Sequence, residues 1–424
     1  MSDEKLAIDG GKPIRTEEYP PWPYFEEDSI EAAMEPLRTG RVNYWTGKVG
    51  VEFEQKFAAW EGTNFAISTA NGTTALHTAL GGLGIGPGDE VIVPSYTFIA
   101  SSMCVPQAGA IPVFADVEKL THTISPESIL EKISPRTKAI IPVHLYGCMA
   151  DMGAIMDIAK EYGLYVVEDA AQAHGGKYNG KMAGSIGDIG AFSFCQSKHF
   201  TTGGEGGMVV TDNEEWAWNC RSFRDHGYDV SERIRLLELE EKLPYIHQRI
   251  GYNFRLTEMQ SAIGIVQLEK MDSWNTPNRR RNAKILDAAL EGEDYILALP
   301  IDTEERENAY WQYPIILNTE RLSVDARDFF KAVGAEGVPA GPVMWPQSYK
   351  EACYRKHVGF GRLQYPFRDP HVRAEATDYI NTFCPNAAWA ESRTFFVPVH
   401  PTYEEQDMHD IAAAIKKVGR AYLK

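Results

Sequence analysis

The stretch that decides the architecture of this chain is Gly187-Asp-Ile-Gly-Ala-Phe-Ser-Phe-Cys-Gln-Ser-Lys-His-Phe-Thr-Thr-Gly-Gly-Glu-Gly-Gly207. Residues 190–194 are apolar except for Ser193, which predicts a short buried strand. A polar turn with Lys198 follows, and then a loop with four glycines, a residue used where backbone passes close to another group. A lysine at the end of a strand can attack a carbonyl once burial or nearby positive charge removes its proton. Lys198 is therefore a candidate catalytic residue, and the alternative is a surface lysine beside a flexible loop.

Short apolar segments of the same kind recur along the chain. They predict strands at 66–69, 90–94, 110–114, 138–143, 164–169, 190–194 and 207–211, with helices at 51–60, 75–83, 151–162 and 214–223. This alternation predicts an α/β fold whose mostly parallel sheet is covered on both faces. Ligands of such sheets bind at the carboxyl ends of the strands. Asn71, Asp169 and Lys198 all fall at such ends.

Three regions differ enough in composition to predict a domain organisation. Residues 1–50 are rich in proline and aromatic residues, and we expect an arm that packs over the scaffold. Residues 51–272 form the predicted large domain. Residues 273–424 are predicted to form a smaller α+β domain, with a strand at 309–317 and helices at 324–333 and 404–418.

Two segments near the end of the predicted large domain have their own character. The charge-rich residues 228–249 predict a solvated helix or a flap. An amphipathic helix follows, and its apolar stripe is predicted to contain Leu256, Met259, Ile263 and Val266.

Composition narrows the class of protein. The net charge of −17 over 424 residues and the isoelectric point near 5.2 disfavour nucleic acid or an anionic membrane as the main partner. The six cysteines lie far apart without a CxxC pair, which argues against a zinc site and a disulfide framework. The polar start and the lack of an apolar run of about 18 residues predict a soluble cytoplasmic protein.

Three features together suggest one cofactor. Asn71-Gly-Thr-Thr74 at a predicted helix start offers backbone N–H groups and hydroxyls to a phosphate, although such residues also cap many ordinary helices. Asp169 ends an apolar strand and needs a partner such as a protonated heteroaromatic nitrogen; an N-cap or a metal-binding role is the alternative. With Lys198 as a Schiff-base residue, these features make a pyridoxal 5′-phosphate (PLP) site.

An aromatic ring is expected to stack on such a cofactor. Phe98 is the first candidate and Tyr96 the second, and burial in the core is the alternative for both. His144, Tyr146 and His199 lie near predicted strand ends and are candidates for substrate contact, with a structural role as the alternative.

The chain resembles the DegT/DnrJ/EryC1/StrS family of aminotransferases, which act on keto-sugars and keto-cyclitols. Within it, the chain looks like the branch of glutamine:scyllo-inosose aminotransferases and aminohydroxybenzoate synthases. The resemblance covers roughly residues 5–420. It rests on the Lys198 segment and on Leu6-Ala-Ile-Asp-Gly-Gly11, Ala70-Asn-Gly-Thr-Thr-Ala-Leu76, Gly88-Asp-Glu-Val-Ile-Val-Pro-Ser-Tyr-Thr-Phe98, Pro142-Val-His-Leu-Tyr-Gly147, Val167-Glu-Asp-Ala-Ala-Gln-Ala-His-Gly175 and Gly251-Tyr-Asn-Phe-Arg-Leu256.

The resemblance implies a fold-type I PLP-dependent transferase that works as a homodimer with shared active sites. Residues 51–272 would then form the PLP-binding domain. Lys198 would be linked covalently to the cofactor and Asp169 would hold its ring nitrogen. The remaining implied contacts are Gln172 near the cofactor hydroxyl, Gly72, Thr73 and Ser193 at the phosphate, and Asn253 reaching the phosphate from the neighbouring subunit.

The resemblance also sets what to expect of the reaction. Glutamine or glutamate would donate the amino group, and a keto-cyclitol like scyllo-inosose or a keto-sugar would accept it. Phe98 stands where family members often have tryptophan. Residues 195–197 and 228–249 vary in the family and leave the acceptor open, including a nucleotide-linked keto-sugar. A deoxysugar dehydratase, in which histidine replaces the lysine, and a non-catalytic PLP-binding regulator are the remaining alternatives.

Overall fold

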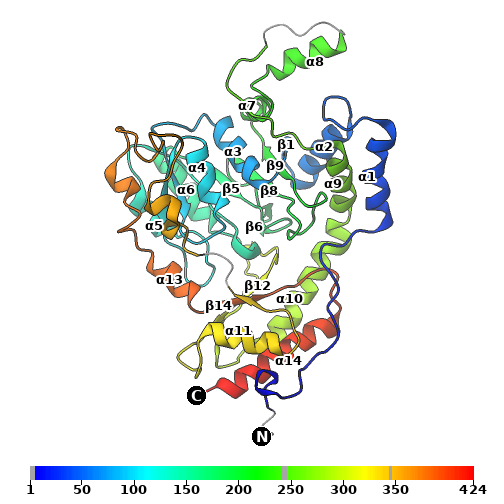
Figure 1. The fold of residues 1–424 in the computed structure, drawn as a ribbon, viewed down its shortest axis with the longest axis vertical. Coiled ribbons are helices and arrows are strands. Elements are labelled where there is room, and N and C mark those ends of the chain that lie inside the picture. Colours follow the sequence, from blue (N-terminus) through cyan, green and yellow to red (C-terminus); the bar gives the residue numbers. More distant parts are fainter. Residues whose placement is uncertain (1–4, 240–245, 343–345) are drawn as a thin grey trace.

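The computed structural model describes residues 5–239, 246–342 and 346–424. Its centre is a seven-stranded sheet with the order β1-β9-β8-β5-β4-β2-β3 (Figure 1). Its strands are β1 Phe65–Thr69, β2 Glu90–Pro94, β3 Ile111–Ala115, β4 Thr137–Ile140, β5 Tyr165–Asp169, β8 Ile189–Ser193 and β9 Gly207–Thr211. All neighbouring pairs are parallel except those made by β9. The predicted α/β fold with a mostly parallel sheet is therefore confirmed.

The antiparallel strand β9 determines where the Lys198 loop lies. β8 and β9 pair directly, with Ser193 opposite Gly207. The chain therefore reverses its direction within residues 194–206, and this loop, which carries Lys198, stays at the carboxyl end of β8. The carboxyl end of β5, with Asp169, lies next to it because β5 and β8 are parallel neighbours.

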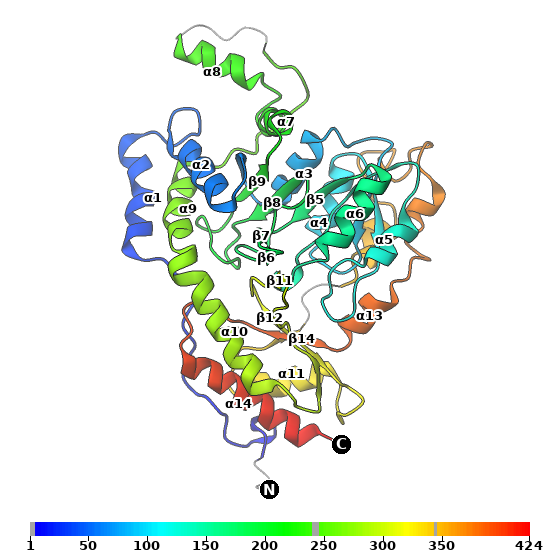
Figure 2. The ribbon, with the colours of Figure 1, turned by 180° about the vertical axis from the view of Figure 1, so that it is seen from behind.

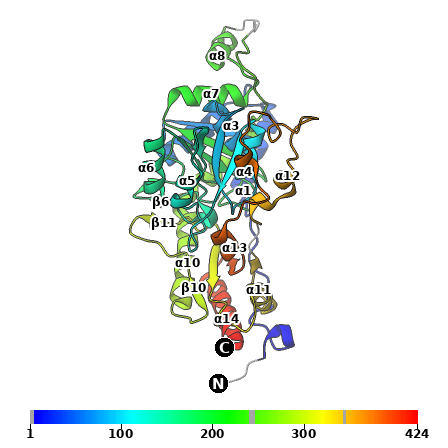
Figure 3. The same ribbon diagram turned by 90° about the vertical axis from the view of Figure 1, so that its left-hand side faces the viewer.

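Successive side chains of β8 point to opposite faces of the sheet, and each face is covered by helices. Phe192 meets Phe57 of helix α2 with 5.0 Å between the ring centres. Ser193 points the other way, against Gly72 at the start of α3. Figure 3 shows α3 and α6 on opposite sides of the sheet. The helices of this larger body are α1 Glu27–Thr39, α2 Val49–Glu61, α3 Gly72–Gly82, α4 Ala100–Gln107, α5 Pro126–Lys132, α6 Met152–Tyr162, α7 Glu214–Arg224, α8 Val230–Glu238 and α9 Glu258–Glu269.

A second apolar core lies below this body, beside both chain ends (Figures 1 and 2). Its sheet has the order β10-β12-β14-β13, with strands Ile296–Ala298, Tyr313–Leu317, Thr394–Val397 and Gly341–Pro342. Its helices are α10 Thr276–Leu290, α11 Ala326–Ala335 and α14 Glu405–Tyr422. The π-helical turn η3, Met271–Asn275, connects α9 to α10 between the two bodies.

Part of the C-terminal third packs on the larger core. Tyr349, Tyr354, Phe367 and Tyr379 belong to the cluster that surrounds the seven-stranded sheet. This segment contains the short helices η4 Ser348–Lys350, α12 Ala352–Arg355, η5 Ala374–Thr377 and α13 Pro385–Glu391. The division into residues 1–50, 51–272 and 273–424 stays a proposal. The remaining short elements are η1 Ala7–Asp9, η2 Leu145–Gly147 and a small sheet of β6 Lys177–Tyr178, β7 Lys181–Met182 and β11 Arg306–Glu307.

The apolar stripe expected on the helix after residue 256 is only partly correct. Leu256 is buried, but Met259, Ile263 and Val266 of α9 are half-buried. The fully covered positions of α9 include small residues such as Gly264, where an added Cβ would lie 2.6 Å from the ring of Phe53. The reason is that α9 is pressed between α1 and α2 (Figure 1), so close approach selects small side chains over large apolar ones.

Two other expectations need comment. The predicted arm, residues 1–50, contains helix α1, which lies along α9 (Figures 1 and 2). The charge-rich segment 228–249 includes α8, which projects from the top of the molecule in Figure 1. Residues 240–245 of that segment lie outside the described residues.

Across the described ranges, every helix is too short or too polar to cross a lipid bilayer. The same ranges contain no group of three or more His, Cys, Asp or Glu side chains placed to hold a metal ion. All six cysteines are free thiols.

Candidate active site

A cavity of about 800 Å³ opens at the carboxyl ends of β5 and β8, where α3 begins. Seven of the eight residues expected at a cofactor site line it: Gly72, Thr73, Phe98, Asp169, Gln172, Ser193 and Lys198. Residues from four separate stretches of sequence thus meet in one place. Their individual roles remain predictions.

The start of α3 forms one wall of the cavity. Asn71 caps the helix, because its Oδ1 accepts a hydrogen bond from the Thr74 N–H at 2.9 Å. Thr74 Oγ1 accepts from the Asn71 N–H at 3.0 Å and completes a capping box. Gly72 and Thr73 occupy the first helical positions, where backbone N–H groups have no partner inside the helix. This wall is suited to an anion.

Gly72 brings that wall into contact with β8. A Cβ atom at position 72 would lie 2.6 Å from Cβ and 3.0 Å from Oγ of Ser193. Only glycine lets the helix start come this close without a shift of the backbone. The Ser193 hydroxyl and the first N–H groups of α3 therefore face one small space.

Asp169 lies on the adjoining wall with only 5% of its surface exposed. One carboxylate oxygen accepts a hydrogen bond from Ser101 Oγ at 2.7 Å, and the other accepts one from the Ala171 N–H at 3.2 Å. Burial raises the pKa of Asp169, and these two hydrogen bonds and Lys198 oppose that shift. A cationic N–H in the cavity would stabilise the ionised form of this carboxylate.

Lys198 has an amine whose basicity is reduced by its surroundings. Burial lowers the pKa of Lys198 to about 8, although the charge of Asp169 acts in the opposite direction. The Nζ atom lies 4.1 Å from the ring centre of Trp311. A lysine with this pKa carries a substantial fraction of neutral, nucleophilic amine near neutral pH.

The two candidates for the stacking ring occupy different places. Phe98 lines the cavity and is 50% exposed. Tyr96 is fully buried in the core, with its hydroxyl 3.4 Å from that of Tyr146. Gln172 reaches the cavity while its Oε1 accepts a hydrogen bond from the Tyr146 N–H at 2.7 Å. Phe98 is therefore the ring that can face a ligand.

Asn253 is absent from the described residues that line the cavity. Its side chain is exposed, and its backbone pairs with Asp225 after α7. The neighbouring residues Tyr252 and Phe254 do line the cavity. A contact from Asn253 to the same chain's cavity is therefore absent, and its cross-subunit role stays a proposal.

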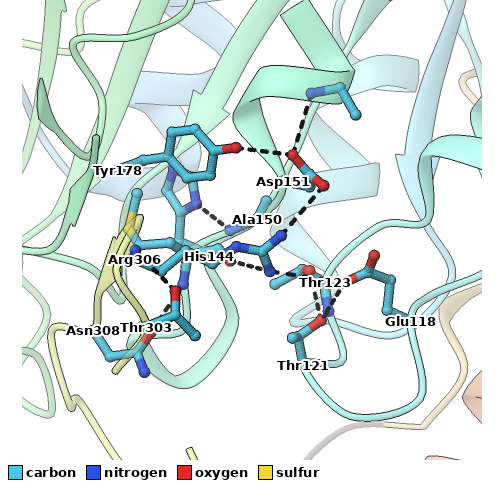
Figure 4. Close-up of polar contacts among 12 residues, drawn as sticks. Glu118, Thr121, Thr123, His144, Ala150, Asp151, Tyr178, Thr303, Arg306 and Asn308 are labelled. Atoms are coloured by element: carbon cyan, nitrogen blue, oxygen red, sulfur yellow. Dashed lines mark hydrogen bonds and ion pairs between the residues drawn. The ribbon is translucent and has the colours of Figure 1, made fainter. Parts of the chain in front are cut away.

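The other polar candidates are held in structural contacts outside the described lining. His144 is fully buried; its Nδ1 accepts from the Ala150 N–H at 3.1 Å and its Nε2 lies 2.9 Å from Glu168. His199 Nε2 lies 3.0 Å from the carbonyl oxygen of Ala309. Figure 4 shows the polar contacts around His144 and Ala150. Close to them, Arg306 Nη2 forms an ion pair with Asp151 Oδ2 at 3.3 Å. The structure thus favours the structural alternative for His144 and His199, and for Tyr146, which is buried at positive φ.

Several lining residues had no signal in the sequence. Trp311 lies just before β12 and reaches back to Lys198. His77 lies one turn beyond the capping box, and burial lowers its pKa to about 4. Phe360 comes from the C-terminal segment that packs on the larger core. Glu205 is the exception, because its position within the glycine loop near Lys198 marks it as a candidate in the sequence.

The arrangement fits PLP on its own chemistry. A phosphate suits the helix start beside Ser193, a protonated ring nitrogen suits the buried carboxylate of Asp169, and an aldehyde suits the amine of Lys198. The fold and this site define the class of PLP-dependent transaminases.

The chain belongs to the DegT/DnrJ/EryC1/StrS aminotransferase family, whose model matches residues 23–416. It is 35% identical to an L-glutamine:2-deoxy-scyllo-inosose aminotransferase of Streptomyces paromomycinus, over 98% of this chain and 97% of that protein. It is 37% identical to a UDP-N-acetyl-3-dehydro-alpha-D-glucosamine 3-aminotransferase of Acidithiobacillus ferrooxidans, over 89% and 90%. An aminotransferase structure from Psychrobacter cryohalolentis superposes with a TM-score of 0.82 at 35% identity, covering 94% of this chain and 98% of that one.

Proposed function

We propose that this transaminase moves an amino group from glutamine or glutamate to the ketone of a keto-cyclitol like scyllo-inosose, or of a keto-sugar. The observation that carries the proposal is the meeting of Lys198, Asp169 and the start of α3 in one cavity. We further propose that the enzyme is a cytoplasmic homodimer in which Asn253 completes the site of the partner subunit.

Each residue has a defined task in this proposal. The N–H groups of Gly72 and Thr73 and the hydroxyl of Ser193 bind the phosphate of PLP. Asp169 keeps the proton on the ring nitrogen, and Phe98 covers the ring on one side. Bound in this way, PLP supplies an electron sink for negative charge at the donor carbon.

Lys198 is the base and the acid of the reaction. Its pKa of about 8 lets the amine take a proton from the α-carbon of the donor and return it elsewhere at neutral pH. The same amine does the reverse when the ketone is the substrate.

The charge of the cavity supports an uncharged polyol ketone as acceptor. Within the described part of the chain, the walls contain one lysine, Lys198, and no arginine, while Asp169 and Glu205 are acidic. His77 is neutral at pH 7 because its pKa lies at about 4. A nucleotide diphosphate would bring two or more negative charges that this chain's own walls do not balance.

Relatives named for a cyclitol and for a nucleotide-linked sugar match this chain at similar identity and differ in the length matched. The relative named for 2-deoxy-scyllo-inosose spans nearly the whole of both chains, whereas the UDP-sugar relative leaves about a tenth of each unmatched. A nucleotide-linked keto-sugar remains the alternative. Lys198 argues against the dehydratase alternative, for which histidine is expected at this position, and a non-catalytic regulator would leave the donor unconverted.

One experiment tests the assignment of Lys198, and a second tests the acceptor. Borohydride reduction of the PLP-loaded enzyme followed by peptide mapping should place the tag on Lys198, and a tag elsewhere would reject the assignment. Lys198→Ala is the activity control, and Lys160→Ala on the exposed side of α6 is the matched control for surface lysines.

Acceptor screening distinguishes the substrates. After glutamine has bleached the PLP absorbance, keto-inositols should restore it, and nucleotide-linked keto-sugars should restore it more slowly. The opposite order would transfer the assignment to a nucleotide-sugar aminotransferase.

A further inference from the structure

The carbonyl oxygens of residues 197–199 each accept a hydrogen bond from a side chain far away in the sequence. The donors are the indole N–H of Trp311 at 2.5 Å, the indole N–H of Trp22 at 3.0 Å and the side-chain amide of Asn275 at 2.5 Å, in that order. The carbonyl group of Lys198 and those of both adjacent residues are thus fixed by hydrogen bonds. The donors come from the N-terminal arm, the end of η3 and the approach to β12.

Such an arrangement has a physical purpose in an irregular loop. Residues 197–199 lie outside helices and strands, so their carbonyl groups have no regular ladder to join. Side chains that donate to these carbonyl groups therefore fix the backbone of the loop. Because Trp311 and Asn275 are both almost fully buried, these donors are themselves held firmly by packing.

Trp311 also makes a direct contact with the lysine amine. Its ring centre lies 4.1 Å from Lys198 Nζ, within the range of a cation–π interaction. Its N–H binds the Ser197 carbonyl at the same time. One indole therefore fixes both the backbone before Lys198 and the end of its side chain.

Arg279 of α10 connects the three donors. Its Nε donates to Asn275 Oδ1 at 2.8 Å, and its Nη1 donates to the Trp311 carbonyl at 3.3 Å. Its guanidinium carbon lies 5.2 Å from the ring centre of Trp22. Arg279 is fully buried, and this burial lowers its pKa to about 9. Its contacts therefore offset part of the free-energy cost of removing the guanidinium from water.

We propose that Trp22, Asn275, Arg279 and Trp311 form a clamp of positioning residues for Lys198, and that the face of Trp311 holds the lysine amine whenever it is not joined to the cofactor. This inference rests on the proposed function, because it assigns the clamp to the catalytic lysine. The amine would otherwise be able to turn away from the reacting carbon during each half of the reaction.

Several titratable groups near Lys198 influence its pKa, and the measurement must separate their effects from that of Trp311. Asp169 approaches from β5, and Cys195 and Glu205 from the same loop. His174 and His199 lie behind the lysine, and burial lowers the pKa of both. A substitution at Trp311 leaves all of these groups in the chain. Because burial is the main cause of the lowered Lys198 pKa, the comparison with Trp311→Phe, which keeps much of that burial, separates the aromatic face from the loss of packing.

The test uses cofactor-free enzyme and competitive acetylation with acetic anhydride across pH 6–11, read by peptide mass spectrometry. Trp311→Leu removes the aromatic face and should lower the pKa of Lys198 by about one unit. Trp311→Phe keeps a face and should leave that pKa within about 0.3 units of the native value. Acetylation of the exposed Lys160 gives the internal reference. An unchanged Lys198 pKa in Trp311→Leu would overturn the amine-holding role.

The backbone part of the clamp is tested separately. Trp22→Phe keeps an aromatic ring but loses the indole N–H, and hydrogen exchange in the peptide containing residues 196–200 should become at least about tenfold faster, since one hydrogen bond is lost. In the loaded enzyme the same variant should lower kcat with little change in the KM of the donor. Unchanged exchange would overturn the clamp, and a raised KM alone would indicate substrate contact instead.

A folding defect or a wrong function is distinguishable from failure of the clamp. Arg279→Lys retains the charge and serves as a milder variant if Trp311→Leu does not fold; it should also speed exchange of residues 196–200. If borohydride tags Lys198 while both the pKa and the exchange stay native, only the clamp is rejected. If no tag appears on Lys198 in the native enzyme, the proposed function fails first.

Discussion

Gly72 at the start of α3 and Ser193 at the end of β8 touch so closely that a methyl group at position 72 would lie 2.6 Å from the serine Cβ. The contact joins a helix start to a strand end. It also forms the space that we assign to the phosphate of PLP. Any side chain at position 72 must either displace Ser193 or move the helix.

We therefore expect Gly72→Ala to weaken PLP binding by at least about tenfold and to destabilise the protein by roughly 1–3 kcal/mol, the usual cost of overpacking. Equilibrium titration of the cofactor-free enzyme and thermal unfolding measure the two effects. Gly334→Ala on α11 is the matched control, because its new methyl group would contact nothing within 4 Å. Native PLP affinity in Gly72→Ala would remove the phosphate from this position.

The pKa of Lys198 predicts how fast the cofactor attaches. Only the neutral amine attacks the aldehyde, and the pKa lies at about 8. The second-order rate of PLP attachment should therefore rise between pH 7 and pH 9 and then level off, as followed by stopped-flow absorbance. A rate that keeps rising beyond pH 10 would mean that the lysine titrates like an ordinary exposed one.

The same shift predicts a stability effect. The folded state releases the Lys198 proton at about pH 8, whereas the unfolded chain keeps it to about pH 10.5, the ordinary pKa of a lysine. The penalty for burying the charged amine is thus fully present below pH 8 and disappears as the pH rises through 10.5. Lys198→Met should raise the free energy of unfolding of cofactor-free enzyme at pH 7 by about 3 kcal/mol.

Denaturant unfolding at pH 7 and pH 10.5 measures this difference. The gain should shrink at the higher pH. Lys160→Met, on an exposed position of α6, is the control and should change little at either pH. A gain of equal size at both values would show that packing of the methionine, and not the lost charge, is responsible.

Asp169 and Ser101 offer a graded test of the acidic partner. Asp169→Asn keeps the shape but removes the charge, and kcat should fall at least about 100-fold because the ring proton loses its partner. Ser101→Ala removes the 2.7 Å hydrogen bond and leaves the charge, so its effect on kcat should be much smaller. Equal losses in the two variants would contradict a role for the charge.

Asn253 can be tested by mixing subunits. Neither Lys198→Ala nor Asn253→Ala should retain full activity alone, and Asn253→Ala should lose PLP more readily on dialysis. Dissociating and recombining the two variants should restore activity, since each mixed dimer contains one site with both native residues. Recombination without any gain would place Asn253 outside the partner's site.

The parts of the site that follow strand ends could be predicted from the sequence. Short, mostly apolar strands such as β5 and β8 are buried on both faces. Asp169 at the end of β5 and Lys198 in the loop after β8 are therefore expected at a shared edge of the sheet. The capping box at Asn71 has a local pattern as well. These features depend on neighbours in the sequence.

The supports of Lys198 could not be predicted in the same way. Trp22, Asn275 and Trp311 act on backbone carbonyls 76 to 176 residues away, and such hydrogen bonds leave no periodicity or spacing. The face of α9 was misjudged for a related reason. Helical periodicity identifies large apolar side chains, but close packing against α1 and α2 requires small ones such as Gly264.

The long reach of these supports has a consequence for biosynthesis. While the nascent chain emerges from the ribosome, Lys198 appears more than a hundred residues before Trp311, the last of the four groups that fix its loop. A polypeptide halted between these points carries the reactive amine on an untethered segment. The ability to bind PLP should therefore arise late in translation, once the C-terminal strands have packed.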